Sequence, residues 1–199
     1  MSWSGSLTSP RAETRRSRQP DDTELLARVA RGDLVAFEHL YRVYQLRLTR
    51  FLTALLKRPE LIEEVLDDTM MVIWQTAGNF RGSSKVSTWI FAIAYRKAHK
   101  AKVRWPEPVE DPEVDNRVSS DPGPDDELGR QKLRAALMEA MDRLSVDHRA
   151  VVDLTYFHDM GYREIAEIVG CPVDTVKTRM FHARRRLKQA MSGSLVDWI

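Results

Sequence analysis

The chain has 199 residues, 43% of them hydrophobic, and a formal net charge of +2, which suits one large or two small globular domains and excludes a wholly disordered chain. It contains no apolar run of about eighteen residues that could cross a membrane, and its single cysteine excludes an internal disulfide. The net charge conceals an uneven distribution, because residues 106–127 hold nine acidic residues and one arginine.

Residues 1–20 form a basic segment with no apolar signal core. Four arginines, Arg11, Arg15, Arg16 and Arg18, are spread along it. A secretory signal would need a central apolar stretch after its positive charges. We therefore expect a flexible basic tail and a cytoplasmic protein.

Residues 21–105 predict a first helical domain with no alternating strand pattern. One helix starts at Asp22, with Asp21, Asp22 or Thr23 available as its cap. A longer helix begins near Gly32, and Pro59 ends that pattern and starts a third helix. We expect a fourth helix over residues 84–104.

The third predicted helix has an acidic outer face. Its inward stripe is formed by Ile62, Leu66, Met70 and Ile73. Residues 59–80 contain no Lys or Arg, so this helix is not expected to meet DNA. It is either a plain solvated face or a surface for a basic protein partner.

The fourth predicted helix has two apolar sides. Its buried stripe is formed by Val86, Trp89, Ile90, Ile93, Ala94 and Ala101. Phe91 and Tyr95 lie off that stripe beside several cations. Such rings favour single-stranded nucleic acid, because bases stack on them while cations neutralise phosphates; the alternative is that both pack against a neighbouring helix. The candidate nucleic-acid residues are Phe91, Tyr95, Arg96, His99, Lys100, Lys102 and Arg104.

Residues 106–127 predict a flexible acidic linker. Five prolines and nine acidic residues leave too little apolar surface to bury, so the segment should be extended. It is either a solubilising spacer or an acidic strand that occupies a basic channel or masks the basic helices.

Residues 128–191 predict a second helical domain with a helix-turn-helix. Its first helix has an apolar stripe around Ile165 and Ile168, and Gly170 can adopt the positive φ that ends it. Cys171-Pro172 opens the second helix, whose positions 177–188 hold six Lys or Arg and no acid. A basic second helix of this kind lies in the major groove of DNA. Its outer face carries Lys177, Thr178, Phe181, His182, Arg184, Arg185 and Lys188.

Four motifs, in this order and spacing, are close to one family pattern. They are Phe37–Tyr41, Ile62–Trp74, Phe80–Ala94 and Leu144–Leu187. With them the chain resembles bacterial RNA polymerase sigma factors of the extracytoplasmic-function type over roughly residues 21–190. The resemblance fits the predicted fold class: all-α, with two helical domains joined by an acidic Pro-rich linker, the second containing a helix-turn-helix.

The resemblance implies that this protein is a promoter-specificity subunit of core RNA polymerase. The acidic helix would dock on the β′ coiled coil, with matching positions at Glu64, Asp67, Asp68 and Trp74. The fourth helix would read the −10 element as opened strand. The second domain would read the −35 element as duplex and touch the β flap, and the linker would thread the RNA path of the polymerase.

The resemblance also implies roles within the recognition helix. Lys177, Thr178, Phe181 and His182 match base-proximal positions, and Thr175 and Arg179 are better placed for phosphates. Arg96 departs from the family, which usually has Asn there. An anti-sigma protein, often membrane-anchored, would be a further partner. The basic tail and residues 192–199 lie outside the shared pattern.

Two other classes of function compete with this one. A stand-alone helix-turn-helix regulator would bind operator DNA without polymerase, usually as a dimer on paired half-sites. An enzyme is disfavoured, because the five histidines are scattered and no phosphate loop or nucleophile elbow is present. We therefore expect no catalytic residues, no metal and no cofactor.

Overall fold

The computed structural model describes residues 21–105 and 127–191, and within them the predicted all-helical fold is confirmed. The predicted basic tail, all of the acidic linker except Glu127, and residues 192–199 lie outside the described residues. The α-helices are α1 (Asp22–Val29), α2 (Leu34–Leu55), α3 (Pro59–Thr76), α4 (Val86–Arg104), α5 (Glu127–Asp142), α6 (Val146–Tyr156), α7 (Tyr162–Val169) and α8 (Val173–Ala190). A single 3-10 turn, η1 (Ala77–Asn79), follows α3.

Local sequence signals set where the first helices begin. The side chain of Asp21 accepts a hydrogen bond from the Thr23 amide, which makes Asp21 the N-cap among the three predicted candidates. Asp33 caps α2 by accepting from two backbone amides at 3.0 and 3.1 Å. Pro59 stands at the first position of α3, where its missing N–H costs nothing.

The predicted helix-turn-helix is formed by α7 and α8. Gly170 follows α7 with φ 67° and ψ 39°, the left-handed conformation predicted for this position. Pro172 then precedes α8 as its N-cap residue. The buried face of α8 is formed by Val176, Met180 and Ala183, with Leu187 partly buried beside them.

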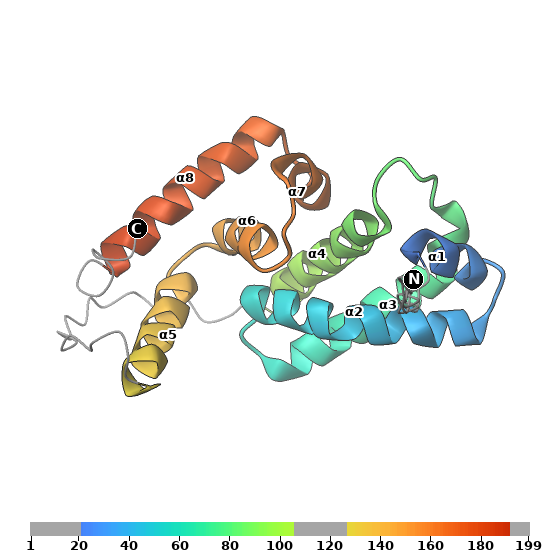
Figure 1. The fold of residues 1–199 in the computed structure, drawn as a ribbon, viewed down its shortest axis with the longest axis horizontal. Helices are drawn as coiled ribbons and strands as arrows, with labels where there is room; N and C mark the ends of the chain where they lie inside the picture. Colours follow the sequence, from blue (N-terminus) through green and yellow to red (C-terminus); the bar gives the residue numbers. More distant parts are fainter. Residues whose placement is uncertain (1–20, 106–126, 192–199) are drawn as a thin grey trace, which may run out of the picture.

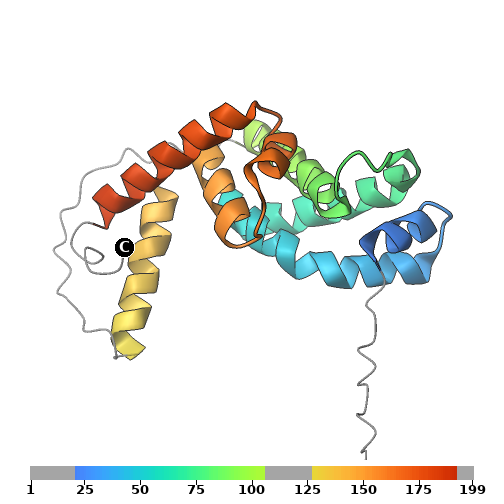
Figure 2. The same ribbon diagram turned by 45° about the horizontal axis from the view of Figure 1, so that its top comes forward.

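The two halves of the chain, residues 21–105 and residues 127–191, lie against each other (Figures 1 and 2). In the first half α4 packs on α3 and α2, and in the second half α8 packs on α6 and α7. The halves meet where α7 contacts α4 and where α6 contacts α2. Nearly all buried apolar residues of both halves belong to one continuous core.

Helix α4 is buried on nearly all sides along its first half. The sequence predicts one inward stripe, but the buried residues of α4 are Val86, Thr88, Ile90, Phe91, Ala92, Ile93, Ala94, Tyr95 and Ala98. The reason is that α2 and α3 cover one side while α7 and the preceding loop cover the other. Trp89, predicted to be buried, is only half-buried at the edge of this packing, beside Phe80.

Among the described residues, no helix combines the length and the apolar character needed to span a membrane.

Replacing Gly170 tests the left-handed turn. An alanine there must adopt φ near 67°, which costs about 1–2 kcal/mol for a residue with a Cβ, so we expect Gly170→Ala to lower the free energy of unfolding by that amount. Gly78→Ala is the control, because Gly78 has no positive φ and nothing lies within 4 Å of an added Cβ. Its stability should be unchanged or raised by up to about 1 kcal/mol. Urea unfolding measures the stability of both variants. Equal effects would contradict the left-handed conformation assigned to Gly170.

Candidate nucleic-acid interface

The outer face of α8 is basic and exposed, as predicted. Phe181 is 63% exposed and stands among the cations. Of the residues predicted for duplex DNA, six are exposed and two are half-buried. The exposed ones are Lys177, Thr178, Phe181, His182, Arg184 and Arg185, and the half-buried ones are Thr175 and Arg179.

Local contacts on α8 leave its long cations near the surface. Lys177 Nζ lies 3.0 Å from Asp174 Oδ1, with side chains 59% and 90% exposed. An exposed ion pair one turn apart contributes less than about 1 kcal/mol to stability, so Lys177 can easily exchange Asp174 for a phosphate or a base edge. Arg184 Nε donates to the Tyr156 hydroxyl at 3.0 Å, which ties the middle of α8 to the end of α6.

Helix α4 presents a second cationic stripe. Arg96, Lys100 and Arg104 are exposed and lie four residues apart, so they share one face of the helix. His99 and Lys102 are half-buried. The cations predicted for the opened strand thus divide into an exposed row and a partly covered pair.

The prediction that Phe91 and Tyr95 are exposed is wrong. Phe91 is 0% and Tyr95 6% exposed. The ring of Phe91 lies 5.2 Å from that of Phe51 in α2 and 4.7 Å from that of His158, in the loop between α6 and α7. The alternative that these rings pack against neighbouring elements is therefore the one that the structure supports, and the neighbours come from both halves.

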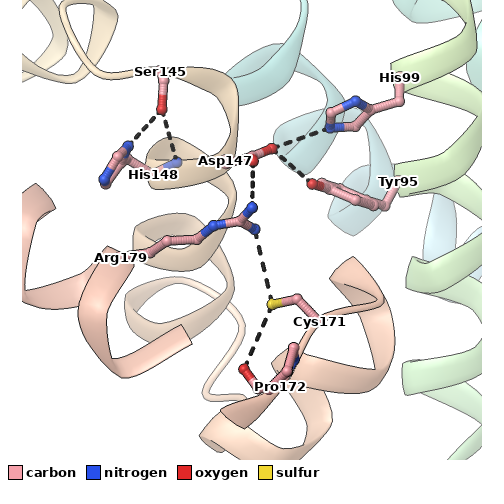
Figure 3. Close-up of polar contacts among 8 residues, drawn as sticks. All are labelled: Tyr95, His99, Ser145, Asp147, His148, Cys171, Pro172 and Arg179. Carbon is pink, nitrogen blue, oxygen red and sulfur yellow. Dashed lines mark hydrogen bonds and ion pairs between the residues drawn. The ribbon is translucent and has the colours of Figure 1, made fainter. Parts of the chain in front are cut away.

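Tyr95 belongs to a polar cluster centred on Asp147 of α6 (Figure 3). We define the Asp147 cluster as Tyr95, His99, Asp147 and Arg179. The Tyr95 hydroxyl donates to Asp147 Oδ1 at 2.9 Å, His99 Nε2 lies 3.4 Å from the same oxygen, and Arg179 pairs with Oδ2 at 2.6 Å. Burial, and then the neighbouring carboxylate, raise the pKa of Tyr95, so its hydroxyl remains a donor at neutral pH.

A second polar contact joins α4 and α7. Lys85, at the N-cap of α4, pairs with Glu164 Oε1 at 2.9 Å. Glu164 also accepts from the Gly161 amide at 3.0 Å and so caps α7. Burial acts to raise the pKa of Glu164, but the bonds from Lys85 and Gly161 outweigh it and hold the pKa below its usual value.

The acidic face of α3 is exposed at the predicted positions. Glu64, Asp67 and Asp68 are all exposed, and Asp68 pairs with Lys97 of α4 at 2.9 Å. Trp74 is half-buried, with its ring 5.1 Å from that of Phe37 in an edge-on contact. This face lies within the first half of the chain.

Most of the predicted site residues lie on three surfaces: the outer face of α8, the exposed cation row of α4 and the acidic face of α3. The Asp147 cluster also brings together Tyr95 and His99, predicted for the opened strand, and Arg179, predicted for the duplex. Sequence reasoning missed the residues that join the halves, namely Lys85, Asp147, His158 and Glu164. In the part of the chain that the structure describes, no three His, Cys, Asp or Glu side chains are grouped to hold a metal ion.

Two family models match the chain. Sigma-70 region 2 matches residues 40–104 and Sigma-70 region 4 matches residues 134–187. The sequence is 29% identical over 187 residues to the RNA polymerase sigma-H factor of Pseudomonas aeruginosa, covering 89% of this chain and 97% of that protein. It is 30% identical to the ECF RNA polymerase sigma-E factor of Haemophilus influenzae, covering 85% and 95%. It is 33% identical to the ECF RNA polymerase sigma factor RpoE of Cereibacter sphaeroides, covering 80% and 88%.

Two solved structures share the fold. CnrH, in complex with the cytosolic domain of CnrY, has a TM-score of 0.65 and 22% identity, covering 86% of this chain and 97% of CnrH. The sigma factor RpoE of Bartonella quintana, in complex with the anti-sigma factor NepR, has a TM-score of 0.61 and 24% identity, covering 81% and 98%. These likenesses extend over both helical halves.

Phe91 should behave as a core residue in mutagenesis. Because its ring is fully buried between the two halves, Phe91→Ala should lower the free energy of unfolding by about 3–5 kcal/mol in urea. Phe181→Ala is the control, since that ring is 63% exposed, and its effect on stability should stay within about 0.5 kcal/mol. Similar unfolding curves for the two variants would show that Phe91 is not part of the core.

Proposed function

Since the chain belongs to the extracytoplasmic-function sigma factors of RNA polymerase, which are initiation factors and not enzymes, we propose that it brings core polymerase to promoters through two reading helices. Helix α8 reads the −35 element as duplex, and α4 reads the −10 element as opened strand. A domain of residues 21–105 serves the polymerase and the −10 element, and a domain of residues 128–191 serves the −35 element.

The observation that carries the proposal is the exposed basic face of α8 behind the left-handed turn at Gly170. Lys177, Thr178, Phe181 and His182 are exposed toward the first part of the helix, where a recognition helix meets base edges. Arg184 and Arg185 continue the face and suit phosphates. Thr175 and Arg179 flank it and are half-buried, which suits backbone contacts at its border.

The role proposed for α4 starts from its exposed cations. Arg96, Lys100 and Arg104 form a row that can follow the phosphates of a single strand. Tyr95 and His99 lie on the side that the second half covers, so they serve the strand only after that half moves away. Lys102 is half-buried and adds a further cation to this end of the helix. Phe91 supports this face from the core, packed on Phe51.

The acidic face of α3 is proposed to dock on the β′ coiled coil of core polymerase. Glu64, Asp67 and Asp68 project from a helix that has no Lys or Arg, so the surface is complementary to a basic one. Trp74 packs beside it on Phe37 and supplies an aromatic edge. The second domain is proposed to touch the β flap, and the acidic linker to follow the RNA path of the polymerase.

An anti-sigma protein is proposed as a further partner. The RpoE of Bartonella quintana was solved with the anti-sigma factor NepR, and CnrH with the cytosolic domain of CnrY. The likeness covers 97% and 98% of these two chains. A partner of this kind, often a membrane-anchored protein for sigma factors of this type, would hold the chain away from polymerase.

Run-off transcription on a genomic promoter library tests the proposed function. Purified core polymerase is supplied with and without this protein. Transcripts that need the protein and share spaced −35 and −10 elements are the expected result. Failure to obtain them, together with binding of duplex fragments by the protein alone, would favour a stand-alone regulator instead.

Lys177→Ala should weaken binding to the −35 duplex by about 1–3 kcal/mol if Lys177 contacts a base edge. The loss should be smaller on a duplex with a scrambled −35 element, because no specific edge is read there. Lys188→Ala removes the same charge further along the exposed face of α8 and should affect both duplexes alike. Fluorescence anisotropy measures the affinity for both duplexes. An equal loss of affinity for Lys177→Ala on both duplexes would show that Lys177 contacts a phosphate and not a base edge.

Asp67→Lys should lower the affinity for core polymerase by at least about tenfold, because it places a like charge against a basic docking surface. Asp67 is a better target than Asp68, whose pairing with Lys97 would also be lost. Glu24→Lys, an equal charge reversal on the exposed side of α1, is the control and should bind normally. Biolayer interferometry with immobilised core polymerase measures the affinity of both variants. Normal binding by Asp67→Lys would show that the acidic face of α3 is a solvated surface and does not bind polymerase.

A further inference from the structure

The Asp147 cluster brings the two proposed promoter-reading helices to one carboxylate. Tyr95 and His99 reach it from α4, and Arg179 reaches it from α8 (Figure 3). All three belong to the residues proposed to contact promoter DNA. Asp147 lies in the first turn of α6 and is one-third exposed, so its two oxygens face partners on two sides.

A carboxylate offers these residues what a DNA phosphate offers. Both are anions with several acceptor oxygens, and both take charge-assisted hydrogen bonds from Arg and hydrogen bonds from Tyr hydroxyls. Arg179 and Tyr95 therefore satisfy within the chain the bonds that they would make to a phosphate. The side chain of Arg179 is 24% exposed, less than that of its neighbour Lys177 at 59%.

This arrangement excludes simultaneous reading of both promoter elements. The centres of the −35 and −10 elements lie about 25 base pairs apart, which is roughly 85 Å along B-form DNA at 3.4 Å per base pair. In the structure, Arg179 of α8 and Tyr95 of α4 bind the same side chain, at 2.6 and 2.9 Å. The two helices must separate before each can reach its own element.

We propose that Asp147 is an intramolecular competitor of promoter DNA, which holds the two reading helices together in a closed, inactive state of the free chain. The inference rests on the proposed function, since it takes the DNA roles of α4 and α8 from it. Two other contacts between the halves also support the closed state. They are the Lys85–Glu164 ion pair and the packing of His158 on Phe91. Core polymerase binds the two domains at different sites and so binds the open state.

The affinity for core polymerase, measured without DNA, tests the proposal through variants on both sides of the contact. Asp147→Asn replaces the charged carboxylate by a neutral amide, and Tyr95→Phe removes one hydroxyl from the other half. Neither residue is among those proposed to bind polymerase. If closure limits the competent fraction, each variant should tighten binding, Asp147→Asn by about tenfold and Tyr95→Phe by about fivefold. The double variant should gain little over Asp147→Asn, because the hydroxyl acts through that carboxylate.

Glu167→Gln is the matched control. It removes one negative charge from the same half of the chain, at an exposed position on α7 outside the Asp147 cluster. Its affinity for core should stay within about twofold of the parent value. A gain equal to that of Asp147→Asn would mean that general charge, and not closure, governs binding, and it would overturn the proposal.

Zero-length cross-linking reports closure without polymerase or DNA. Lys85 Nζ and Glu164 Oε1 lie 2.9 Å apart across the halves, so a water-soluble carbodiimide should join them by an amide, which peptide mass spectrometry identifies. On raising the salt concentration, the cross-link should disappear earlier in Asp147→Asn and Tyr95→Phe than in the parent chain and Glu167→Gln. Adding core polymerase to the parent chain before the carbodiimide should suppress it.

The two measurements separate the proposal from the proposed function. Equal core affinities and equal cross-link yields for all four proteins would overturn the closed state and leave the sigma function intact. Absence of core binding by the parent chain would overturn the proposed function. The cross-link series would then decide on closure alone, with unchanged yields in Asp147→Asn and Tyr95→Phe overturning it. A Lys85–Glu164 cross-link that persists at saturating core polymerase would also overturn it.

Discussion

The burial of α4 is the constraint on which the rest of the structure depends. Residues 86–95 of this helix have almost no exposed side, because α2 and α3 cover one side and α7 with its preceding loop covers the other. Phe91 shows the consequence most clearly, since it contacts Phe51 of the first half and His158 of the second. The position of the helix-turn-helix relative to the first half is therefore set by how α4 is packed.

The polar contacts add direction to that apolar packing. Apolar side chains alone would allow α7 to slide along α4, because the hydrophobic effect has no preferred geometry. Lys85 and Tyr95 are ten residues apart on this side of the molecule and bind Glu164 and Asp147, two carboxylates on different helices of the second half. Two charge-assisted contacts at separate points fix both the register and the rotation of one half against the other.

The two proposed reading helices differ in accessibility for the same reason. Helix α8 turns its cations outward and uses its apolar face within its own half. Helix α4 has its aromatic side covered, and the cations that it exposes are the row of Arg96, Lys100 and Arg104. The charge that attracts nucleic acid thus stays at the surface in both helices, while the rings suited to bases are treated differently: Phe181 is exposed and Tyr95 is covered.

Much of this fold follows from local signals in the sequence. The helix starts at Asp22 and Pro59 and the turn at Gly170 were predictable, because caps, proline and positive φ act within a few residues. The burial of Phe91 and Tyr95 could only be left open as an alternative, since it depends on Phe51, His158 and Asp147, which are distant in the sequence. The uninterrupted apolar run of residues 89–95 was a signal for burial all round, because a half-exposed helix would have polar residues there.

The residues that join the halves had no comparable signal. Asp147 in the first turn of α6 and Glu164 in the first turn of α7 have a sufficient local explanation, as acidic residues at helix N-termini. Only the packed structure shows that each also binds a residue of the first half. The outer face of α8 was predictable in full, because exposure there depends on helical periodicity alone.

The mixed character of the contact between the halves has a thermal consequence. Its apolar part, around Phe91 and His158, weakens on cooling, as hydrophobic contacts do. Its ionic part, Lys85 with Glu164 and Asp147 with its partners, benefits from warming, because the penalty for removing charges from water falls as temperature rises. Both parts change in the same direction, so the association of the halves strengthens on warming within the range where each half stays folded, and it is weakest in the cold.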